Sequence, residues 1–293
     1  TTGTSNTLVG GLAGEDVTTA TENTFIGQRA GENYTTGDIN TAVGSYALNA
    51  IGGTGTGTVN AAFGKNALLT NTSGSQNTAL GTYALAANTT ASYNTAVGYA
   101  AGTAVTTGVQ NVIIGGLSAD ALTTGQNNVA TGYLSLSSDT KGENSVAIGV
   151  LALNAQNFTT ATSSYNVAVG RSAGAAITTG INNTLIGGLA GDSLTDADLN
   201  VAVGKGALTT DTLGSNSTAL GFAALEAQNF TSATNTYNTA VGSAAGASVT
   251  TGTENTLIGG ISGDALTNAT GNTAVGYSSL TSDTLGSKST AIG

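Results

Sequence analysis

The chain has 293 residues, of which 39% are hydrophobic, and its 16 acidic and 6 basic residues give a formal net charge of -10. An acidic surface repels phosphate backbones, so this balance argues against nucleic-acid binding. The sequence has no cysteine or histidine, which excludes a disulfide framework and the usual transition-metal sites, and it has no apolar run long enough to span a membrane.

A short motif recurs from one end of the sequence to the other, and Asn272–Gly276 (Asn-Thr-Ala-Val-Gly) is a clear copy. It occurs 17 times, and 13 of the 16 intervals between its glycines are 17 residues long, the others being 20 or 21. A fixed short period indicates a repeat architecture. We therefore predict one continuous solenoid domain over residues 1–293, a segment of a longer polypeptide or a processed form, in which each repeat, termed a rung, contacts its neighbours. The motif glycines are Gly10, Gly27, Gly44, Gly64, Gly81, Gly98, Gly115, Gly132, Gly149, Gly170, Gly187, Gly204, Gly221, Gly242, Gly259, Gly276 and Gly293.

Each rung is numbered from its asparagine, so that the motif glycine is the fifth position. The first position is Asn in 14 copies and Ser in three, the second is Thr in 11, the third is Ala in 12, and the fourth is aliphatic or Phe in 16. β-Branched residues at this density favour a strand, so the expected fold is an all-β, parallel β-solenoid of about 17 rungs. The third position lies on one strand face and the second and fourth on the other. We expect both faces to be buried, one inside the coil and the other against a partner chain.

The residues after the strand predict tight backbone geometry. The recurrent glycine indicates a positive φ or the close approach of another backbone. Three residues later a small residue recurs, followed usually by Leu or Gly, as at Leu225 and Gly174. This pattern predicts a second short strand with a narrow interior. Turns such as Thr178–Gly180 then close the rung.

The first-position asparagines predict a ladder of side chains along the solenoid. Identical amide side chains stacked at one strand spacing can hydrogen-bond from rung to rung, and such ladders stabilise stacked strands. The alternative is that asparagine is only a turn residue that tolerates left-handed geometry.

Four rungs form a block of 72 residues, as the spacing of Asn94, Asn166 and Asn238 indicates. Rungs at about 4.8 Å spacing give a rod of roughly 80 Å. A narrow coil has a poor ratio of buried to exposed surface, so we expect it to oligomerise. The blocks cover approximately residues 23–93, 94–165, 166–237 and 238–293.

Two blocks carry an insertion with aromatic residues. Gln156–Thr159 precedes Tyr165, and Gln228–Thr231 precedes Tyr237. Because aromatic residues are efficient contact groups, the candidate contact residues are Phe158, Tyr165, Phe230 and Tyr237. The alternative is that each aromatic side chain folds back to shield a rung edge or braces a neighbouring chain.

The motif Asn144–Gly149 (Asn-Ser-Val-Ala-Ile-Gly) resembles the repeat of the YadA-type head domain of trimeric autotransporter adhesins. In weaker form the resemblance covers the whole chain, and the Asn-Thr-Ala-Val-Gly copies also resemble repeats of phage and viral tail fibres. It implies a left-handed parallel β-roll, three chains side by side, and an attachment role at a cell surface or on a virion. The period here is longer than that of the adhesin heads, and the insertions are additional to the family motif.

The sequence predicts neither an enzyme nor a cofactor or metal site. The basic residues are well separated, and the acids recur once per rung or less, at positions expected to be surface turns. Calcium requires six to eight oxygen ligands, and Asp120, Asp192 and Asp264 are about four rungs apart. We therefore expect these acids, and the pair Glu15 and Asp16, to be solvated. The alternative is that a three-fold axis brings three copies of one acid together.

These observations predict a segment of a homotrimeric extracellular or virion fibre. It would act as a rigid spacer and as an adhesive surface towards a cell-surface receptor or glycan. The alternative is a single-chain β-solenoid module that binds ice or glycans. Ice binding favours outward threonines at both the second and the fourth position, whereas the fourth position here is apolar.

Overall fold

The computed structural model describes residues 2–293; the first residue of the predicted repeat domain lies outside this range. The described residues form strands and turns and contain no helix. They divide into two compact units. Unit 1 extends to Asn144 and includes Phe158–Thr162, and unit 2 comprises Ser145–Asn157 and Ser163–Gly293. Because the units are described separately, the single continuous domain stays a prediction.

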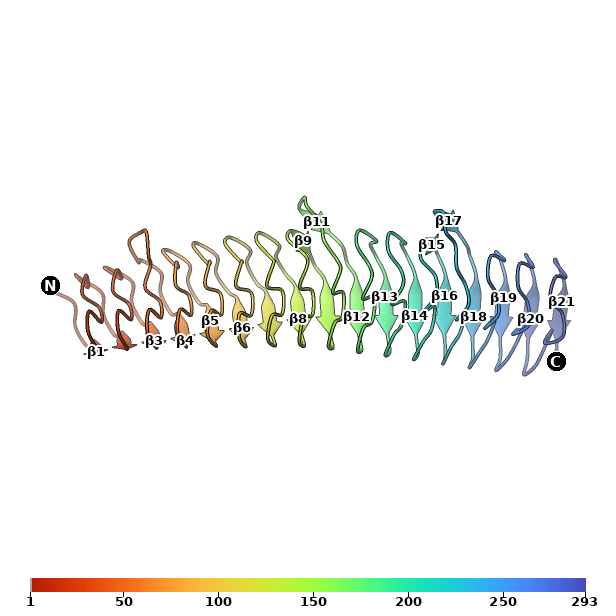
Figure 1. Ribbon diagram of the computed structural model, residues 1–293, viewed down its shortest axis with the longest axis horizontal. Helices are drawn as coiled ribbons and strands as arrows, with labels where there is room; N and C mark the ends of the chain where they lie inside the picture. Colours follow the sequence, from red (N-terminus) through yellow and green to blue (C-terminus); the bar gives the residue numbers. More distant parts are fainter. Residues whose placement is uncertain (1) are drawn as a thin grey trace. The chain divides into compact units, whose positions relative to one another are not determined.

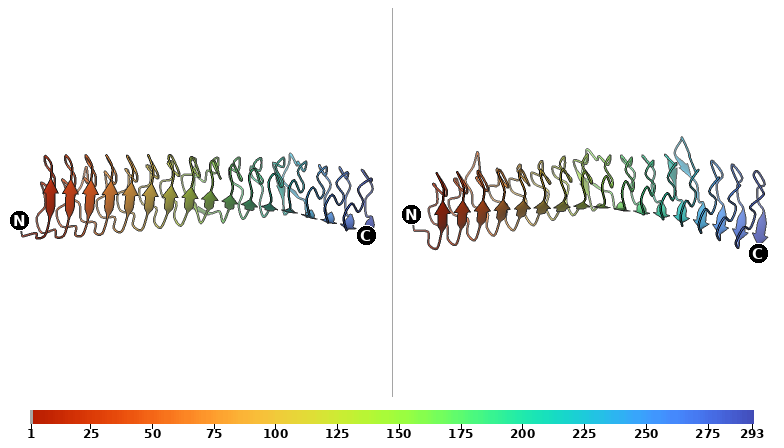
Figure 2. Two further views of the ribbon diagram at one scale, coloured as in Figure 1. Left: turned by 90° about the horizontal axis from the view of Figure 1, so that it is seen from below. Right: turned by 60° about the horizontal axis from the view of Figure 1, so that its bottom comes forward.

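Each unit is a parallel β-solenoid in which every rung contributes one strand of three residues, from the second to the fourth position (Figure 1). Consecutive strands within a unit point the same way (Figure 2) and pair in register, as Thr184–Ile186 pairs with Val201–Val203. The predicted fold class and repeat length are therefore confirmed. In unit 1 the motif strands are β1 (Thr7–Val9), β2 (Thr24–Ile26), β3 (Thr41–Val43), β4 (Ala61–Phe63), β5 (Thr78–Leu80), β6 (Thr95–Val97), β7 (Val112–Ile114) and β8 (Val129–Thr131). In unit 2 they are β10 (Val146–Ile148), β12 (Val167–Val169), β13 (Thr184–Ile186), β14 (Val201–Val203), β16 (Thr218–Leu220), β18 (Thr239–Val241), β19 (Thr256–Ile258), β20 (Thr273–Val275) and β21 (Thr290–Ile292). The two-residue strands are β9 (Gly142–Glu143), β11 (Thr162–Ser163), β15 (Gly214–Ser215) and β17 (Thr234–Asn235).

The interior of each unit is packed by side chains of complementary size. Third-position residues such as Leu185 and Ala202 are fully buried. Beside the large Leu185 the ninth positions are glycines, and a Cβ at Gly174 or Gly191 would lie 2.8 Å from one of its methyl carbons. Beside the small Ala202 the ninth position is the fully buried Leu208. The choice between Leu and Gly therefore reflects the size of a neighbouring core residue.

The predicted second strand is wrong, because this segment is a series of turns. Leu189 and Gly191 have φ angles of 61° and 54°, and this left-handed geometry recurs at the seventh and ninth positions of other rungs. Left-handed residues bend the chain, so no extended strand forms. Bonds to both neighbouring rungs are nevertheless kept. The Leu189 N–H donates to Arg171 O and the Gly191 N–H to Ala207 O, each at 3.0 Å.

The fifth-position glycines form a column in which a side chain has no room. Gly187 has a φ of 135°, which side chains rarely permit. A Cβ on Gly187 would also lie 2.5 Å from the carbonyl oxygen of Gly204, the corresponding glycine of the next rung. Both physical reasons predicted for the recurrent glycine are therefore confirmed.

The first-position asparagines form the predicted ladder inside each unit. The Asn183 N–H donates to Asn166 Oδ1 at 2.9 Å, and Asn183 Oδ1 accepts from the Asn200 N–H at 3.0 Å. Asn183 Nδ2 donates to Ala197 O at 2.8 Å and so holds the far corner of its own rung. These four residues are fully buried. The ladder hypothesis is confirmed, and the bonds involve the backbone N–H as well as the side-chain amide.

Serine replaces asparagine where unit 2 carries its insertion. The Ser217 N–H still donates to Asn200 Oδ1 at 2.9 Å, and its hydroxyl oxygen lies 2.6 Å from Thr236 Oγ1. The fully buried Gln228 connects the two parts of the ladder. Its Nε2 donates to Ser217 Oγ at 2.8 Å, and its Oε1 accepts from Asn238 Nδ2 at 2.9 Å. The longer glutamine side chain therefore continues the ladder where the rung is longer.

A buried tyrosine fills the first irregular rung of unit 1. In this rung Ile51 is 46% exposed, and Tyr34 from the preceding rung is fully buried. The Gly55 backbone lies against its ring, since a Cβ there would be 2.3 Å from Tyr34 Cδ2, and Asn71 Nδ2 donates to Tyr34 Oη at 2.6 Å. Burial raises the pKa of the Tyr34 phenol well above its ordinary value of 10.0, although the bond from Asn71 partly lowers it.

We expect the free energy of unfolding of unit 1 to fall above pH 10 because of Tyr34. Its raised pKa means that the neutral phenol stabilises the fold fully below the pKa of the unfolded chain. As pH rises above that value the unfolded chain ionises first, which costs about 1.4 kcal/mol per pH unit. Urea midpoints between pH 9 and 11 measure the effect. Tyr34→Phe should be less stable at pH 7 but less sensitive to alkali, whereas Tyr93→Phe, at a site 61% exposed, should follow the unsubstituted chain. Parallel curves for all three proteins would contradict this prediction.

Candidate functional site

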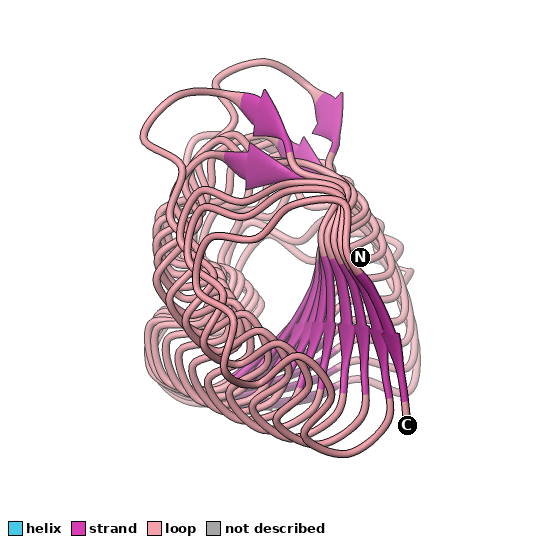
Figure 3. Cartoon of the chain, turned by 90° about the vertical axis from the view of Figure 1, so that its right-hand side faces the viewer, coloured by secondary structure: helices cyan, strands magenta, loops and turns pink. Residues whose placement is uncertain are grey.

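In each unit the strands lie along one side of the coil (Figure 3), and their second and fourth positions face outward. The fourth-position side chains are aliphatic or phenylalanine except at Thr131. They are substantially exposed: Ile186 and Ile258 are each 39% exposed and Leu80 is 49% exposed. We name these side chains the apolar column. Its members are Val9, Ile26, Val43, Phe63, Leu80, Val97 and Ile114 in unit 1, and Ile148, Val169, Ile186, Val203, Leu220, Val241, Ile258, Val275 and Ile292 in unit 2.

The expectation of burial on both strand faces is met on the inner face. Third-position residues such as Ala202 are fully buried, whereas the apolar column is open on the described chain. Large exposed apolar patches are uncommon on monomers and mark interaction surfaces. The second position, which carries threonine in 11 rungs, flanks this column. The outward face therefore pairs threonine with aliphatic side chains, which is not the double threonine array favoured for ice binding.

The two insertions form loops that project from the coil near β11 and β17 (Figure 1). Of the predicted contact residues, Tyr165 is 58% exposed and Tyr237 57% exposed, so both are available to a partner. Phe158 and Phe230 are only 6% and 7% exposed, so neither ring presents a contact surface. For these two phenylalanines the geometry agrees with the alternative in which the ring folds back onto its rung.

A buried aspartate fixes the loop of unit 2. Asp211 Oδ1 accepts from the backbone N–H groups of Phe230 at 2.9 Å and Gly214 at 3.1 Å. Its Oδ2 accepts from Gln228 Nε2 at 2.6 Å. In unit 1 the Phe158 N–H likewise donates to Asp139 Oδ1, at 3.1 Å. Both aspartates are fully buried, so the expectation of acids at surface turns is wrong for them. They are placed to accept bonds that an inserted loop would otherwise leave unmade.

The other recurrent acids lie at the tenth position and are half-buried. Thr281 Oγ1 donates to Asp264 Oδ1 at 2.6 Å, and Asp192 accepts a corresponding bond from Thr209. Asp120 Oδ1 is buried without a hydrogen-bond partner, and desolvation raises the pKa of this carboxyl, while a backbone hydrogen bond lowers it in part. These acids are therefore not simply solvated, whereas Glu15 and Asp16 are exposed as expected. Within residues 2–293 no three acidic side chains gather in a way that could hold a metal ion.

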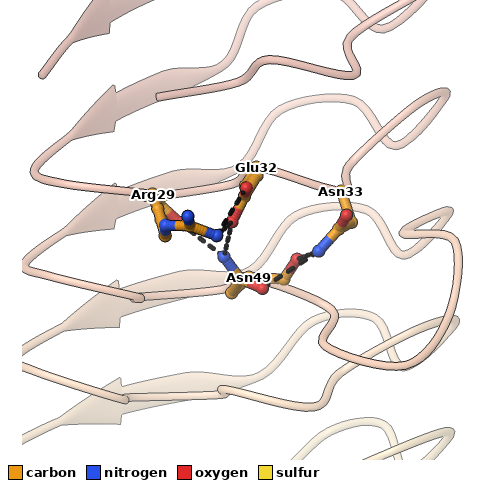
Figure 4. Close-up of polar contacts among 4 residues, drawn as sticks. All are labelled: Arg29, Glu32, Asn33 and Asn49. Carbon is orange, nitrogen blue, oxygen red and sulfur yellow. Dashed lines mark hydrogen bonds and ion pairs between the residues drawn. The ribbon is translucent and has the colours of Figure 1, made fainter. Parts of the chain in front are cut away.

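A polar cluster near the start of unit 1 was not predicted. Arg29 Nη1 lies 3.0 Å from Glu32 Oε1, and Asn49 Nδ2 donates to Glu32 Oε2 at 2.9 Å (Figure 4). Asn33 Nδ2 donates to Asn49 Oδ1 at 3.0 Å, and the Arg29 guanidinium lies 5.7 Å from the centre of the Tyr46 ring. These groups pair with one another across adjacent rungs, so we interpret the cluster as structural. The opposite charges three residues apart were the available sequence signal.

No protein-family model, curated protein or solved structure matches this chain. The resemblance of Asn144–Gly149 to the adhesin repeat therefore stands on the motif alone. In the part of the chain that the structure covers, no helix has the length and apolarity needed to span a membrane. The surfaces that remain as candidates are the apolar column and the projecting loops.

Proposed function

We propose that this chain is a structural segment of a homotrimeric extracellular fibre, with a left-handed β-roll in each chain. Its role is that of a rigid spacer with an attachment surface, and it is not catalytic. The supporting observation is the apolar column, which a single chain leaves open to water. Three copies packed along this column would bury it and cover the outer face of every strand.

The column is large enough to matter energetically. Complete burial of an isoleucine side chain is worth about 1.5–3 kcal/mol, so side chains that start 39% exposed, such as Ile186 and Ile258, would each contribute roughly 1 kcal/mol. Summed over the rungs, these contributions can exceed the loss of translational and rotational freedom on association. The interlocked ladder and core favour a stiff rung stack.

The attachment part of the proposal rests on repetition. Tyr165 and Tyr237 are exposed, and they recur 72 residues apart at the base of similar loops. In a trimer each such feature would be present three times. Repeated weak contacts to a receptor or glycan then add through avidity without any single strong site. The motif resemblance to adhesin heads and tail fibres supports a location on a cell surface or virion.

Native mass spectrometry and sedimentation test the trimer directly. We expect a species of three times 28.2 kDa. The double substitution Ile186→Lys and Ile258→Lys should shift it to monomer, because lysines on the apolar column would repel one another and resist burial. Thr251→Lys is the matched control, since this site is exposed and off the sheet. A chain that is monomeric at all concentrations, or a lysine double variant that stays trimeric, would overturn the proposal.

A further inference from the structure

A surface hollow of about 300 Å³ lies in unit 2, between the sixth and tenth positions of three consecutive rungs. This side of the coil is separate from the apolar column of the strands. Its volume is at the lower end of the range for ligand sites, which suits a single small ring. Its lining includes Leu189, Lys205, Gly206, Thr209, Phe222 and Glu226.

The hollow exists because the seventh position lacks a side chain in one rung. Gly206 has a φ of 67°, and a Cβ on it would meet no atom within 4 Å. In other rungs this position holds a leucine at a similar angle, as at Leu134 (54°) and Leu151 (61°). The backbone therefore does not require glycine here. The effect of Gly206 is to open space between Leu189 and the next rung.

The two walls of the hollow differ in chemistry. The sixth position supplies the ring of Phe222, which is 58% exposed, and the exposed Lys205. The tenth position supplies Thr209 and the exposed Glu226. Thr209 donates its hydroxyl proton to Asp192, so it offers a ligand an acceptor. A ligand would therefore meet one aromatic face, one cationic donor and two oxygen acceptors.

We propose that this hollow binds a pyranose unit of a neutral glycan. A pyranose has an apolar C–H face that can stack on Phe222, and hydroxyl groups that accept from Lys205 while donating to Glu226. A purely apolar ligand would leave both charged groups without partners on burial. A polyanion would meet Glu226 on a chain whose net charge is -10. The neutral sugar satisfies every group of the lining.

This inference names a ligand class for the attachment role proposed above and rests on that role for its biological meaning. The two can nevertheless fail independently. The assembly experiment measures mass after changes on the strands, whereas sugar binding is measured after changes on the opposite, turn-forming part of the rung.

Saturation-transfer difference NMR on the full chain tests the proposal, with methyl glycosides of glucose, galactose and mannose as probes. We expect saturation transfer to at least one glycoside, with its ring C–H protons closest to the protein. Gly206→Leu should weaken binding by about tenfold or more, because leucine fills the hollow at a position where leucine is native to other rungs. Phe222→Ala should weaken it similarly by removing the stacking face.

Tyr277→Ala is the matched control, because Tyr277 is a more exposed aromatic residue (77%) at the sixth position of another rung. It should leave the transfer unchanged, and an unaltered melting temperature should show that Gly206→Leu is folded. The proposal is overturned if no glycoside receives saturation. It is equally overturned if Gly206→Leu and Phe222→Ala both bind like the original chain, or if Tyr277→Ala abolishes binding to the same extent.

Discussion

Replacing Gly187 by alanine is expected to cost about 3 kcal/mol or more of local stability. A φ of 135° is strained for any residue with a Cβ. The new methyl group would also lie 2.5 Å from the carbonyl oxygen and 2.6 Å from the carbonyl carbon of Gly204. These are backbone atoms held by the sheet, so relief requires the two rungs to separate. Separation would weaken the pairing of β13 with β14 on which both rungs depend.

Gly188→Ala is the control for this substitution, one residue further along the chain. A Cβ at Gly188 would meet no atom within 4 Å, so we expect stability to be almost unchanged. Solenoids do not always unfold in a single step, so the readout is amide hydrogen exchange of residues 184–204 together with the urea midpoint. Equal effects of the two alanines would show that the glycine column is not a packing requirement.

Replacing Asn183 by alanine should be comparably severe, at about 3–5 kcal/mol. The substitution leaves the Asn200 N–H and the Ala197 carbonyl without their bonds of 3.0 and 2.8 Å. Both groups are fully buried, and each unsatisfied buried group costs roughly 1–3 kcal/mol. The corner that Asn183 closes would also loosen. Thermal and urea denaturation, with hydrogen exchange at Asn200, measure the loss.

Two further variants separate the ladder from general sensitivity. Asn182→Lys changes the adjacent, exposed asparagine at a position where Lys288 has the same left-handed geometry, so it should be tolerated. Asn183→Ser should remain destabilising although serine occurs natively in the ladder. The reason is that Ser217 depends on Gln228, whereas the corresponding residue in the rung of Asn183 is Leu194. A stable Asn183→Ser protein would contradict this account of the ladder.

The period and the residue types predicted much of the fold. The glycine at every fifth position identified both the strained φ and the backbone contact later seen at Gly187 and Gly204. Repeated asparagines predicted the ladder, because identical side chains at one spacing have few other uses when buried. Burial of the third position followed from strand alternation, as at Ala202.

Other features depend on geometry that the sequence pattern does not carry. The run after the glycine was mistaken for a strand because Leu189 is not a residue type associated with a left-handed φ, yet it has one. The buried Asp211 was mistaken for a surface acid because its partners, Gln228 and the Phe230 N–H, come from the following rung. Phe230 itself was a candidate contact residue because composition alone does not show which way a ring points. The hollow at Gly206 was missed for a related reason, since one glycine among 44 has no distinctive signal.

The size matching inside the coil has a consequence for how such a chain can change in length. Loss of the single rung that carries Gly174 would bring Leu185 beside Leu153, two bulky residues that Gly174 now separates. Gain or loss of a complete 72-residue set would keep every large residue opposite a small one. Unequal recombination within such a gene is therefore expected to yield viable length variants in multiples of four rungs, and population or laboratory deletion series should lack the intermediate lengths.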